Sequence, residues 1–336
     1  MSIEIVKDIL EELYYKLEEK LYYIDRRLAS PIFNLIDDWQ FERDNTKSRS
    51  ESELKREILD LLEKGADVNE PELPPSRYYN NGYTPILKAT EAGASEVVQA
   101  LIENGANVND KLIKDICDPW VPGFYYCPCL NLAVLHDRLE IVKILVKNGA
   151  NLESTESVSG TSRGNTPLHI ACKYNLPEIA KFLIENGAEL NSCPTGWGHV
   201  QYGFGITPLH ITILWSNSLK TVQLLIQHGA DLEKQTTGGQ TALFIAIFTD
   251  QLEMATILIE NGANVNFINF NADGQSPLHL AAKKNHPELT KMLIEFGAEV
   301  KEMDHQGNNA LELSLDHKLL DNFKLIVFDS IFWENE

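Results

Sequence analysis

The chain repeats one short unit along most of its length, and residues 164–189 show that unit most clearly. Here Thr166 can cap a helix through its hydroxyl, and Pro167 suits the first helical position, where no amide hydrogen is needed. A second apolar run at helical spacing follows at once and ends at Gly187, which can adopt the left-handed conformation that closes a helix. The sequence therefore predicts two short antiparallel helices, neither of which can bury its apolar face alone.

Both ends of this unit recur along the chain. A Gly-Ala pair closes the second helix at Gly65, Gly105, Gly149, Gly187, Gly229, Gly262 and Gly297. The start of the first helix recurs at Thr84-Pro85, Thr166-Pro167, Thr207-Pro208, Thr241-Ala242 and Ser276-Pro277, with weaker forms at Pro128-Cys129 and Asn309-Ala310. Because each unit can hide its apolar face only against its neighbours, such units stack into a nearly one-dimensional array.

The motif at the helix start resembles that of the ankyrin-repeat family. TPLH stands whole at Thr166–His169 and Thr207–His210, and it recurs as SPLH at Ser276–His279. The spacing is about one ankyrin period, often stretched. The resemblance implies an all-α fold, a solenoid of about eight helix pairs with elongated finger loops between them and an N-terminal capping helix.

The repeats predict one continuous ankyrin-repeat domain over residues 30–336, preceded by a capping helix at 1–29. The approximate units are 30–83, 84–127, 128–165, 166–206, 207–240, 241–275, 276–308 and 309–336, the last of which is a C-terminal cap. Residues 3–28 place Ile and Leu at helical intervals, with Glu and Lys between them. We expect this helix to cover the apolar face of the first repeat, because the ends of a solenoid must be sealed. Docking onto a partner is the alternative.

Charge and cysteine content limit the partners and the compartment. The net charge of −20 disfavours nucleic acid and anionic membranes, which would repel the chain, so a basic or apolar protein or peptide fits better. The longest apolar run, near Leu243–Phe248, is too short to span a bilayer. Five cysteines without a framework spacing indicate a reducing compartment, and the first residues do not read as a secretory signal. We therefore expect a cytoplasmic protein.

The loops that join the units are enlarged in the first two thirds of the chain. Segments 70–83, 110–127 and 192–206 are rich in Pro, Gly and aromatic residues, and loops this irregular cannot bury every ring. The family resemblance implies that ligands bind the concave surface made by fingers and first helices. Large rigid rings and Arg supply much of the energy at interfaces. We predict that the partner-binding residues are Arg77, Tyr78, Tyr79, Trp120, Phe124, Tyr125, Tyr126, Trp197, His199, Tyr202, Phe204 and Trp215. The alternative is that the rings pack on one another to hold long loops.

The C-terminal segment 323–333 is apolar nearly all round, whereas an ordinary terminal cap shows water a polar face. It either packs back onto the chain or forms a second surface, which a partner or a second copy of the chain would cover. In the second case the contact residues are Phe323, Phe328, Phe332 and Trp333.

Several polar residues have a structural interpretation. The resemblance implies that the motif histidines form hydrogen bonds between turns and neighbouring helices, and these are His169, His210 and His279. Asn69, with Asp67 two residues before it and Leu61 eight before it, resembles the site that asparaginyl hydroxylases modify in ankyrin repeats. Asn69 is therefore a candidate for hydroxylation, although stabilising the loop after the second helix is the more ordinary role.

Neither metal binding nor catalysis has a clear signature. A zinc site would require paired cysteine spacing, which is lacking in the set Cys117, Cys127, Cys129 and His136. For a thiol mechanism the best pair is Cys193 and His199, but both sit in a loop with no positioned oxyanion site. We therefore expect no metal, no other cofactor and no catalytic residue.

The sequence thus predicts a non-catalytic module that binds a protein or peptide. The alternative is a secreted effector of an intracellular bacterium or virus that captures and modulates a host protein in the host cytosol, a use that the family resemblance supports. An enzyme with its substrate held in the finger groove is a weaker hypothesis, because the repeats leave no space for a separate catalytic domain.

Overall fold

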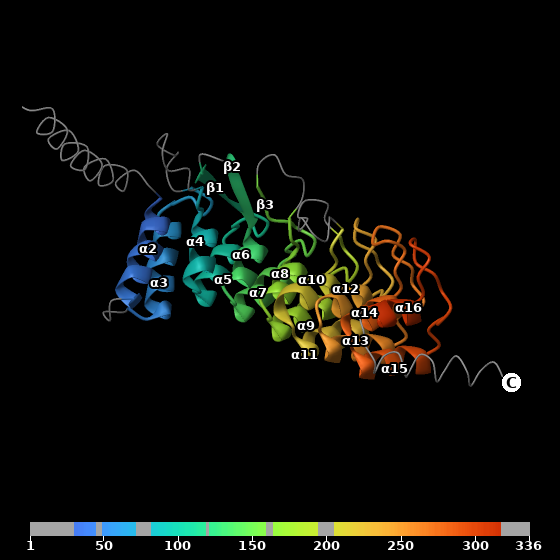
Figure 1. The fold of residues 1–336 in the computed structure, drawn as a ribbon. Coiled ribbons are helices and arrows are strands. Elements are labelled where there is room, and N and C mark those ends of the chain that lie inside the picture. The colour runs from blue at the N-terminus through green and yellow to red at the C-terminus, as the bar shows by residue number, and fades with distance from the viewer. Residues whose placement is uncertain are drawn as a thin grey trace, which may run out of the picture. The chain divides into compact units, whose positions relative to one another are not determined.

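The computed structural model describes residues 30–44, 49–71, 82–118, 121–158, 164–193 and 205–316, and helices dominate these segments (Figure 1). The chain divides into two compact units, Met1–Asn151 with Val158–Gly160 and Leu152–Ser157 with Thr161–Glu336. The predicted capping helix at 1–29 and the predicted second helix of the last repeat lie outside the described residues. These two elements, and one continuous domain over 30–336, stay predictions.

Helices of the first unit come in pairs, in the order that the repeat predicts. The pairs are α2 (Pro31–Asp44) with α3 (Glu51–Glu63), α4 (Pro85–Ala92) with α5 (Ser95–Glu103), and α6 (Cys129–Leu135) with α7 (Leu139–Lys147). The first helices pack on one another in the order α2, α4 and α6, and the second helices pack in the order α3, α5 and α7. Within this unit the helices therefore bury their apolar faces against their own partners and against the neighbouring repeat.

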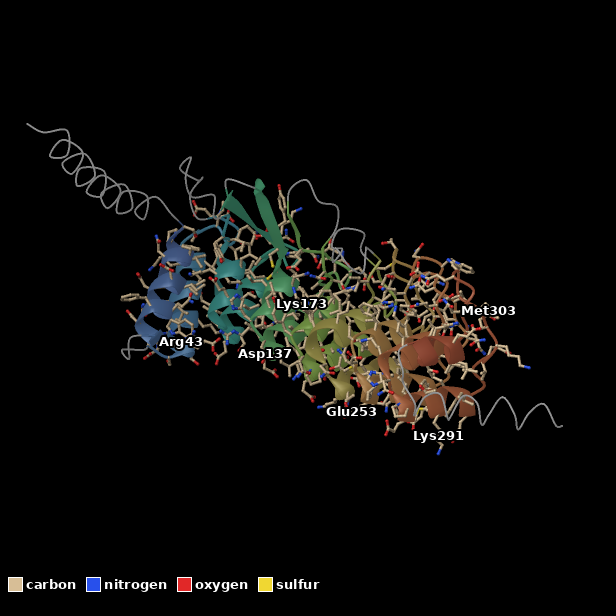
Figure 2. The ribbon with its side chains drawn as sticks, viewed as in Figure 1. Arg43, Asp137, Lys173, Glu253, Lys291 and Met303 are labelled. Carbon is tan, nitrogen blue, oxygen red and sulfur yellow. The ribbon has the colours of Figure 1, made fainter. Side chains whose placement is uncertain are left out.

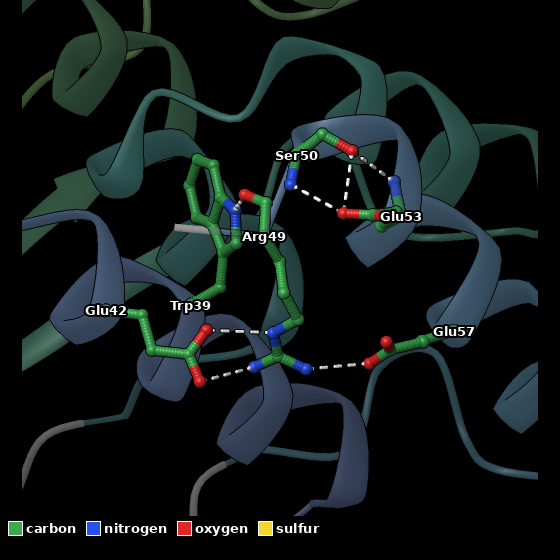
Figure 3. Close-up of polar contacts among 6 residues, drawn as sticks. All are labelled: Trp39, Glu42, Arg49, Ser50, Glu53 and Glu57. Atoms are coloured by element: carbon green, nitrogen blue, oxygen red, sulfur yellow. Dashed lines mark hydrogen bonds and ion pairs between the residues drawn. The ribbon is translucent and has the colours of Figure 1, made fainter. Parts of the chain in front are cut away.

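Side chains tie the enlarged first repeat together (Figure 3). The Trp39 indole Nε1 donates a hydrogen bond to the Arg49 carbonyl at 2.9 Å, so the end of α2 is joined to the loop before α3. The Arg49 guanidinium bridges Glu42 at 2.9 Å and Glu57 at 2.8 Å. Ser50 then caps α3 through a reciprocal pair of hydrogen bonds with Glu53. These contacts explain how the chain keeps two helices packed across a long internal loop.

The finger between α5 and α6 is a β-hairpin rather than an irregular loop. Strands β1 (Lys111–Asp118) and β2 (Val121–Pro128) pair antiparallel, with Lys111 opposite Pro128. The short β3 (Ser157–Val158) follows β2 in the sheet order β1-β2-β3. The expectation of an all-α fold is therefore wrong for this finger. The physical reason is that its sequence is rich in the β-branched and aromatic residues that favour strands.

The second unit continues the same pairing. The pairs are α8 (Pro167–Lys173) with α9 (Pro177–Glu185), α10 (Pro208–Ile211) and its π-helical extension η1 (Thr212–Ser216) with α11 (Leu219–Gln227), α12 (Ala242–Phe248) with α13 (Leu252–Glu260), and α14 (Pro277–Lys284) with α15 (Pro287–Glu295), followed by α16 (Ala310–Asp316). First helices again pack on first helices, and second helices on second helices. The motif leucines form the middle of this core, each 1% exposed, at Leu168, Leu209, Leu243 and Leu278.

The predicted helix boundaries are confirmed at most repeats. The Thr166 hydroxyl accepts a hydrogen bond from the His169 amide, and the equivalent residues cap α10, α12 and α14. Thr84 differs, because its hydroxyl donates to Asp110 at 2.5 Å and does not cap its own helix. Each predicted closing glycine has a positive φ, from 84° at Gly149 to 94° at Gly187. No helix in the described segments is long and apolar enough to cross a membrane.

Candidate partner-binding surface

Most of the predicted finger residues lie outside the described part of the chain, namely Arg77, Tyr78, Tyr79, Trp120, Trp197, His199, Tyr202 and Phe204. The same holds for the predicted second surface, Phe323, Phe328, Phe332 and Trp333. For Phe124 and Tyr125 the structure describes the backbone in β2, and Tyr126 in the same strand is half-buried. Convergence of the finger rings therefore stays a prediction.

Trp215 is the predicted contact residue that the structure describes most fully. Its side chain is 44% exposed, whereas Ile211 and Ile213 beside it in the sequence are buried. On the first helices, Leu132, Ile211 and Phe244 are buried, whereas Trp215 is exposed. Trp is among the residues that contribute most at protein interfaces, so the partly exposed Trp215 is a candidate anchor for a partner.

The local reason for this exposure is a one-residue insertion. In the other repeats of the second unit, a residue in the left-handed conformation follows the capping Thr or Ser by nine positions, at Asn175, Asp250 and Asn285. In the repeat of Trp215 it follows by ten positions, from Thr207 to Asn217. The extra residue is accommodated by the π-helical turn η1, in which the Asn217 amide reaches back to the Thr212 carbonyl at 3.0 Å.

Hydrogen bonds from side chains hold the widened turn. The Thr212 hydroxyl donates to the Pro208 carbonyl at 2.8 Å, and the Ser216 hydroxyl donates to the Thr212 carbonyl at 3.1 Å. From the next repeat, Gln251 Nε2 donates to the Ile213 carbonyl at 2.7 Å. The Pro208 and Thr212 carbonyls also accept backbone amides, so these side-chain bonds add to the backbone bonds of the turn.

Aromatic residues and lysines occupy the equivalent ends of the neighbouring first helices. Tyr174, 53% exposed, follows α8, and the half-buried Phe248 ends α12; these two helices pack on either side of η1. Lys173, at the end of α8 in Figure 2, lies with its Nζ 5.5 Å from the centre of the Tyr174 ring. The Lys284 Nζ lies 5.6 Å from the centre of the Phe248 ring. We call these five residues, Lys173, Tyr174, Trp215, Phe248 and Lys284, the ring ridge.

The acidic group beside the ring ridge is already paired. Asp250 accepts hydrogen bonds from Lys284 at 2.8 Å and from His286 at 2.8 Å. The hydrogen bonds from Lys284 and His286 lower the pKa of Asp250. The sequence prediction missed Tyr174, Lys173 and Lys284. The signal that could have found them is their shared place, directly before the turn that ends each first helix.

Of the motif histidines, His169 and His279 have the structural role that the sequence predicted, whereas, within the described residues, His210 bonds only its own cap, the Thr207 hydroxyl, at 2.8 Å and its Nε2 has no hydrogen-bond partner. The His169 ring shares a hydrogen bond with the Thr166 hydroxyl at 2.7 Å and another with the Ile206 carbonyl at 3.1 Å. Burial lowers the pKa of His169 and of His210 to about 4, so both rings are neutral at pH 7. His279 makes the equivalent contact with the Asn308 carbonyl at 3.2 Å.

Three of the cysteines lie in the core. Cys127, Cys129 and Cys172 are fully buried, and burial raises the pKa of the Cys129 and Cys172 thiols to about 12. In the described segments, no group of three or more His, Cys, Asp or Glu residues could hold a metal ion. The Cys193–His199 pair cannot be placed, since His199 lies outside the described residues.

Asn69 links two successive loops. Its Oδ1 accepts from the Asn107 amide at 2.9 Å, and its Nδ2 donates to the Gly105 carbonyl at 3.1 Å. Asn109 and Asn266 make the same pair of bonds to the loops that follow them. The ordinary role, stabilising the loop after the second helix, is therefore visible in the contacts, whereas hydroxylation of Asn69 stays a prediction.

Comparisons with known proteins agree with this architecture. The family described as "Ankyrin repeats (3 copies)" matches residues 111–194, 192–269 and 265–332, and "Ankyrin repeat" matches residues 81–112. The chain is 31% identical to an ankyrin repeat protein of fowlpox virus over 188 residues, 54% of this chain and 48% of the viral protein. It is 28% identical to the B-cell lymphoma 3 protein homolog of Mus musculus over 140 residues, 41% of this chain and 29% of the mouse protein.

The chain therefore spans about half the length of the viral relative and less than a third of the mouse relative. The crystal structure of the ankyrin repeat domain of Bcl-3 has the same fold, with a TM-score of 0.58 and 24% identity over 73% of this chain and 99% of that domain. Ankyrin repeats bind protein partners, and proteins built from them are typically non-enzymatic scaffolds. From the extent of the family match, the chain belongs to the ankyrin-repeat family.

Proposed function

We propose that this chain is a non-catalytic module that holds a partner protein or peptide against its first helices and finger loops. The observation that supports the proposal most is Trp215, exposed on a widened turn between two first helices that have Tyr174 and Phe248 near their ends. Apolar burial would supply most of the affinity, as it does at other interfaces with aromatic anchors. The net charge of −20 favours a partner with a basic or apolar exterior, and the cysteine content favours a cytoplasmic site of action.

The test is affinity purification with the full chain and with the variant Trp120→Ala, Trp197→Ala and Trp215→Ala. We expect a stoichiometric partner to bind the unchanged chain and to bind the variant more than about 30-fold more weakly, which corresponds to ~2 kcal/mol. Lys291→Ala is the control, because Lys291 is exposed on α15, a second helix, and forms an ion pair with Glu295 on the same helix at 3.6 Å. Equal affinity of the triple variant would contradict the proposal.

A second candidate function is that of a secreted effector which modulates a host protein. The similarity to the fowlpox virus protein favours it, because that relative is viral. A stoichiometric partner recovered from host-cell lysate, with none from the lysate of the organism that encodes the chain, would support the effector. The reverse result would exclude it.

A further inference from the structure

We propose that the outer edge of strand β1, in the finger between α5 and α6, binds an extended peptide segment of the partner as an additional strand of the sheet. This inference rests on the proposed function and names the form in which that finger would hold its partner.

Strand β1 lies at one edge of the three-stranded sheet. The sheet order is β1-β2-β3, so among the described residues β2 has a strand on each side, whereas β1 has a strand only on the side of β2 (Figure 1). All residues of β1, from Lys111 to Asp118, have a partner in β2. The opposite edge of β1 therefore presents a row of main-chain groups, which is the kind of surface that another extended chain completes.

The two prolines of β2 show which groups of β1 point to this edge. Hydrogen-bonded and non-hydrogen-bonded pairs alternate along an antiparallel pair of strands. Pro122 and Pro128 have no amide hydrogen to donate, and they lie opposite Cys117 and Lys111. These two pairs fit the non-bonded positions, where the main-chain groups of both residues point away from the partner strand. Counting every second residue, the outward-pointing residues of β1 are Lys111, Ile113, Asp115 and Cys117.

The pair next to Lys111 agrees with this alternation. Just outside the hairpin, the Cys129 amide donates to the Asp110 carbonyl at 2.8 Å, so that pair is a bonded one. The Lys111 amide itself donates to the Asp110 carboxylate at 2.9 Å. The edge that a partner would pair with therefore runs from Ile113 to Cys117, which is about 13 Å at ~3.3 Å per residue.

Main-chain chemistry identifies the occupant of this edge. The side chains of β1 include two lysines and two aspartates, Lys111, Lys114, Asp115 and Asp118, so their formal charges cancel. Side-chain charge on this strand therefore does not select an acidic or a basic segment. N–H and C=O groups that recur at every second residue are met in register by an extended backbone. A segment that has β-branched or aromatic residues, and no proline at the bonding positions, suits such an edge.

The experiment is selection of phage-displayed random 12-residue peptides on the full chain, followed by anisotropy measurements with the enriched peptides. The test variant is Asp115→Pro, which removes one outward N–H and no hydrogen bond to β2. Asp115→Ala is the matched control, because it changes the same side chain and keeps the amide. We expect the peptides to bind Asp115→Ala as tightly as the unchanged chain, and to bind Asp115→Pro more than about tenfold more weakly.

Backbone N-methylation of the peptides separates strand addition from contact through side chains alone. A methyl group on an amide that bonds to β1 removes that hydrogen bond, so we expect affinity to fall at every second residue of the peptide and to change less at the residues between. This measurement uses the unchanged chain and does not depend on how a variant folds.

Amide hydrogen exchange, measured by NMR, tests the edge in the free chain. We expect faster exchange at the outward amides of Ile113, Asp115 and Cys117 than at the inward amides of Leu112, Lys114 and Ile116, and slower exchange of the outward set once a peptide is bound. Protection of Leu112 and Lys114 in Asp115→Pro shows that the hairpin of the variant is intact.

Four results would overturn the inference. The first is recovery of no peptide that binds, and the second is N-methyl effects without a two-residue period. The third is equal protection of outward and inward amides in the free chain, which would show that the chain itself covers the edge, or that a second copy does if sedimentation finds a dimer that Asp115→Pro abolishes. The fourth is a set of peptides that bind Asp115→Pro at full affinity. If Trp215→Ala weakens that set, the edge is wrong while the proposed function stands.

Discussion

The buried motif histidines make the stability of the repeats depend on pH. His169 and His210 are 1% exposed, and burial lowers the pKa of each to about 4, against 6.5 for an unburied imidazole. Between these values the unfolded chain binds more protons than the folded one, so the free energy of unfolding falls as the pH drops from about 6.5 to 4. The stabilising contribution is complete above this window, at pH 7 and higher.

We expect His169→Gln to reduce this pH dependence. The variant has no ring to protonate, so the loss of stability between pH 7 and pH 5 should be smaller than in the unchanged chain by about 1–2 kcal/mol. Urea unfolding at both pH values measures the difference. His228→Gln is the control, because His228 is exposed at the end of α11. An equal loss of stability in His169→Gln and the unchanged chain would contradict the assignment.

Residue patterns predicted the structural positions well and the contact positions incompletely. Thr166, His169 and Gly187 could be read from the sequence because each has a local role, which is to cap a helix, to bond a neighbouring carbonyl or to take a positive φ. Exposure of Tyr174 is not a local property. It depends on how far the next repeat covers the end of α8, which the sequence of one repeat does not state.

At the scale of elements, the π-helical turn η1 is the clearest departure from the regular repeat. The insertion can be counted from the sequence, since ten positions separate Thr207 from Asn217. The apolar pattern does not reveal the insertion, because the repeat with the π turn begins with the same TPLH motif as the regular repeat at Thr166.

The β-hairpin finger between α5 and α6 was missed for a different reason. Its Pro and Gly residues indicated an irregular loop, yet β1 and β2 pair along their whole length.

Deletion of Ser216 tests what the widened turn contributes. It restores the nine-position spacing of the neighbouring repeats and keeps Trp215, so we expect an ordinary α-helical turn and a free energy of unfolding within about 1 kcal/mol of the original. Because the deletion removes the widened turn that carries Trp215, a partner recovered by affinity purification should bind more weakly. Urea unfolding and anisotropy give the two values. Full affinity in the deletion variant would show that the turn does not position Trp215.

At the scale of the whole molecule, the repeats within each unit are joined by packing and by the loops that follow the second helices. Asn69 bonds the loop of the next repeat in the first unit, and Asn266 does so in the second. At other repeats a carboxylate accepts the equivalent bond, as Glu153 does from the Glu189 amide at 2.9 Å. The family and the helix pairs could be predicted because such contacts recur with the repeat. The identity of the partner could not be predicted, because the same scaffold binds unrelated targets.

The central claim is that a partner covers the first helices and the fingers. Amide hydrogen exchange of the full chain, alone and with the partner recovered by affinity purification, tests it most directly. The account predicts slower exchange on binding in residues 207–218 and in the finger segments 70–83, 110–127 and 192–206, with little change in α9, α11, α13 and α15. Protection confined to those four second helices, with exchange at 207–218 unchanged, would contradict it.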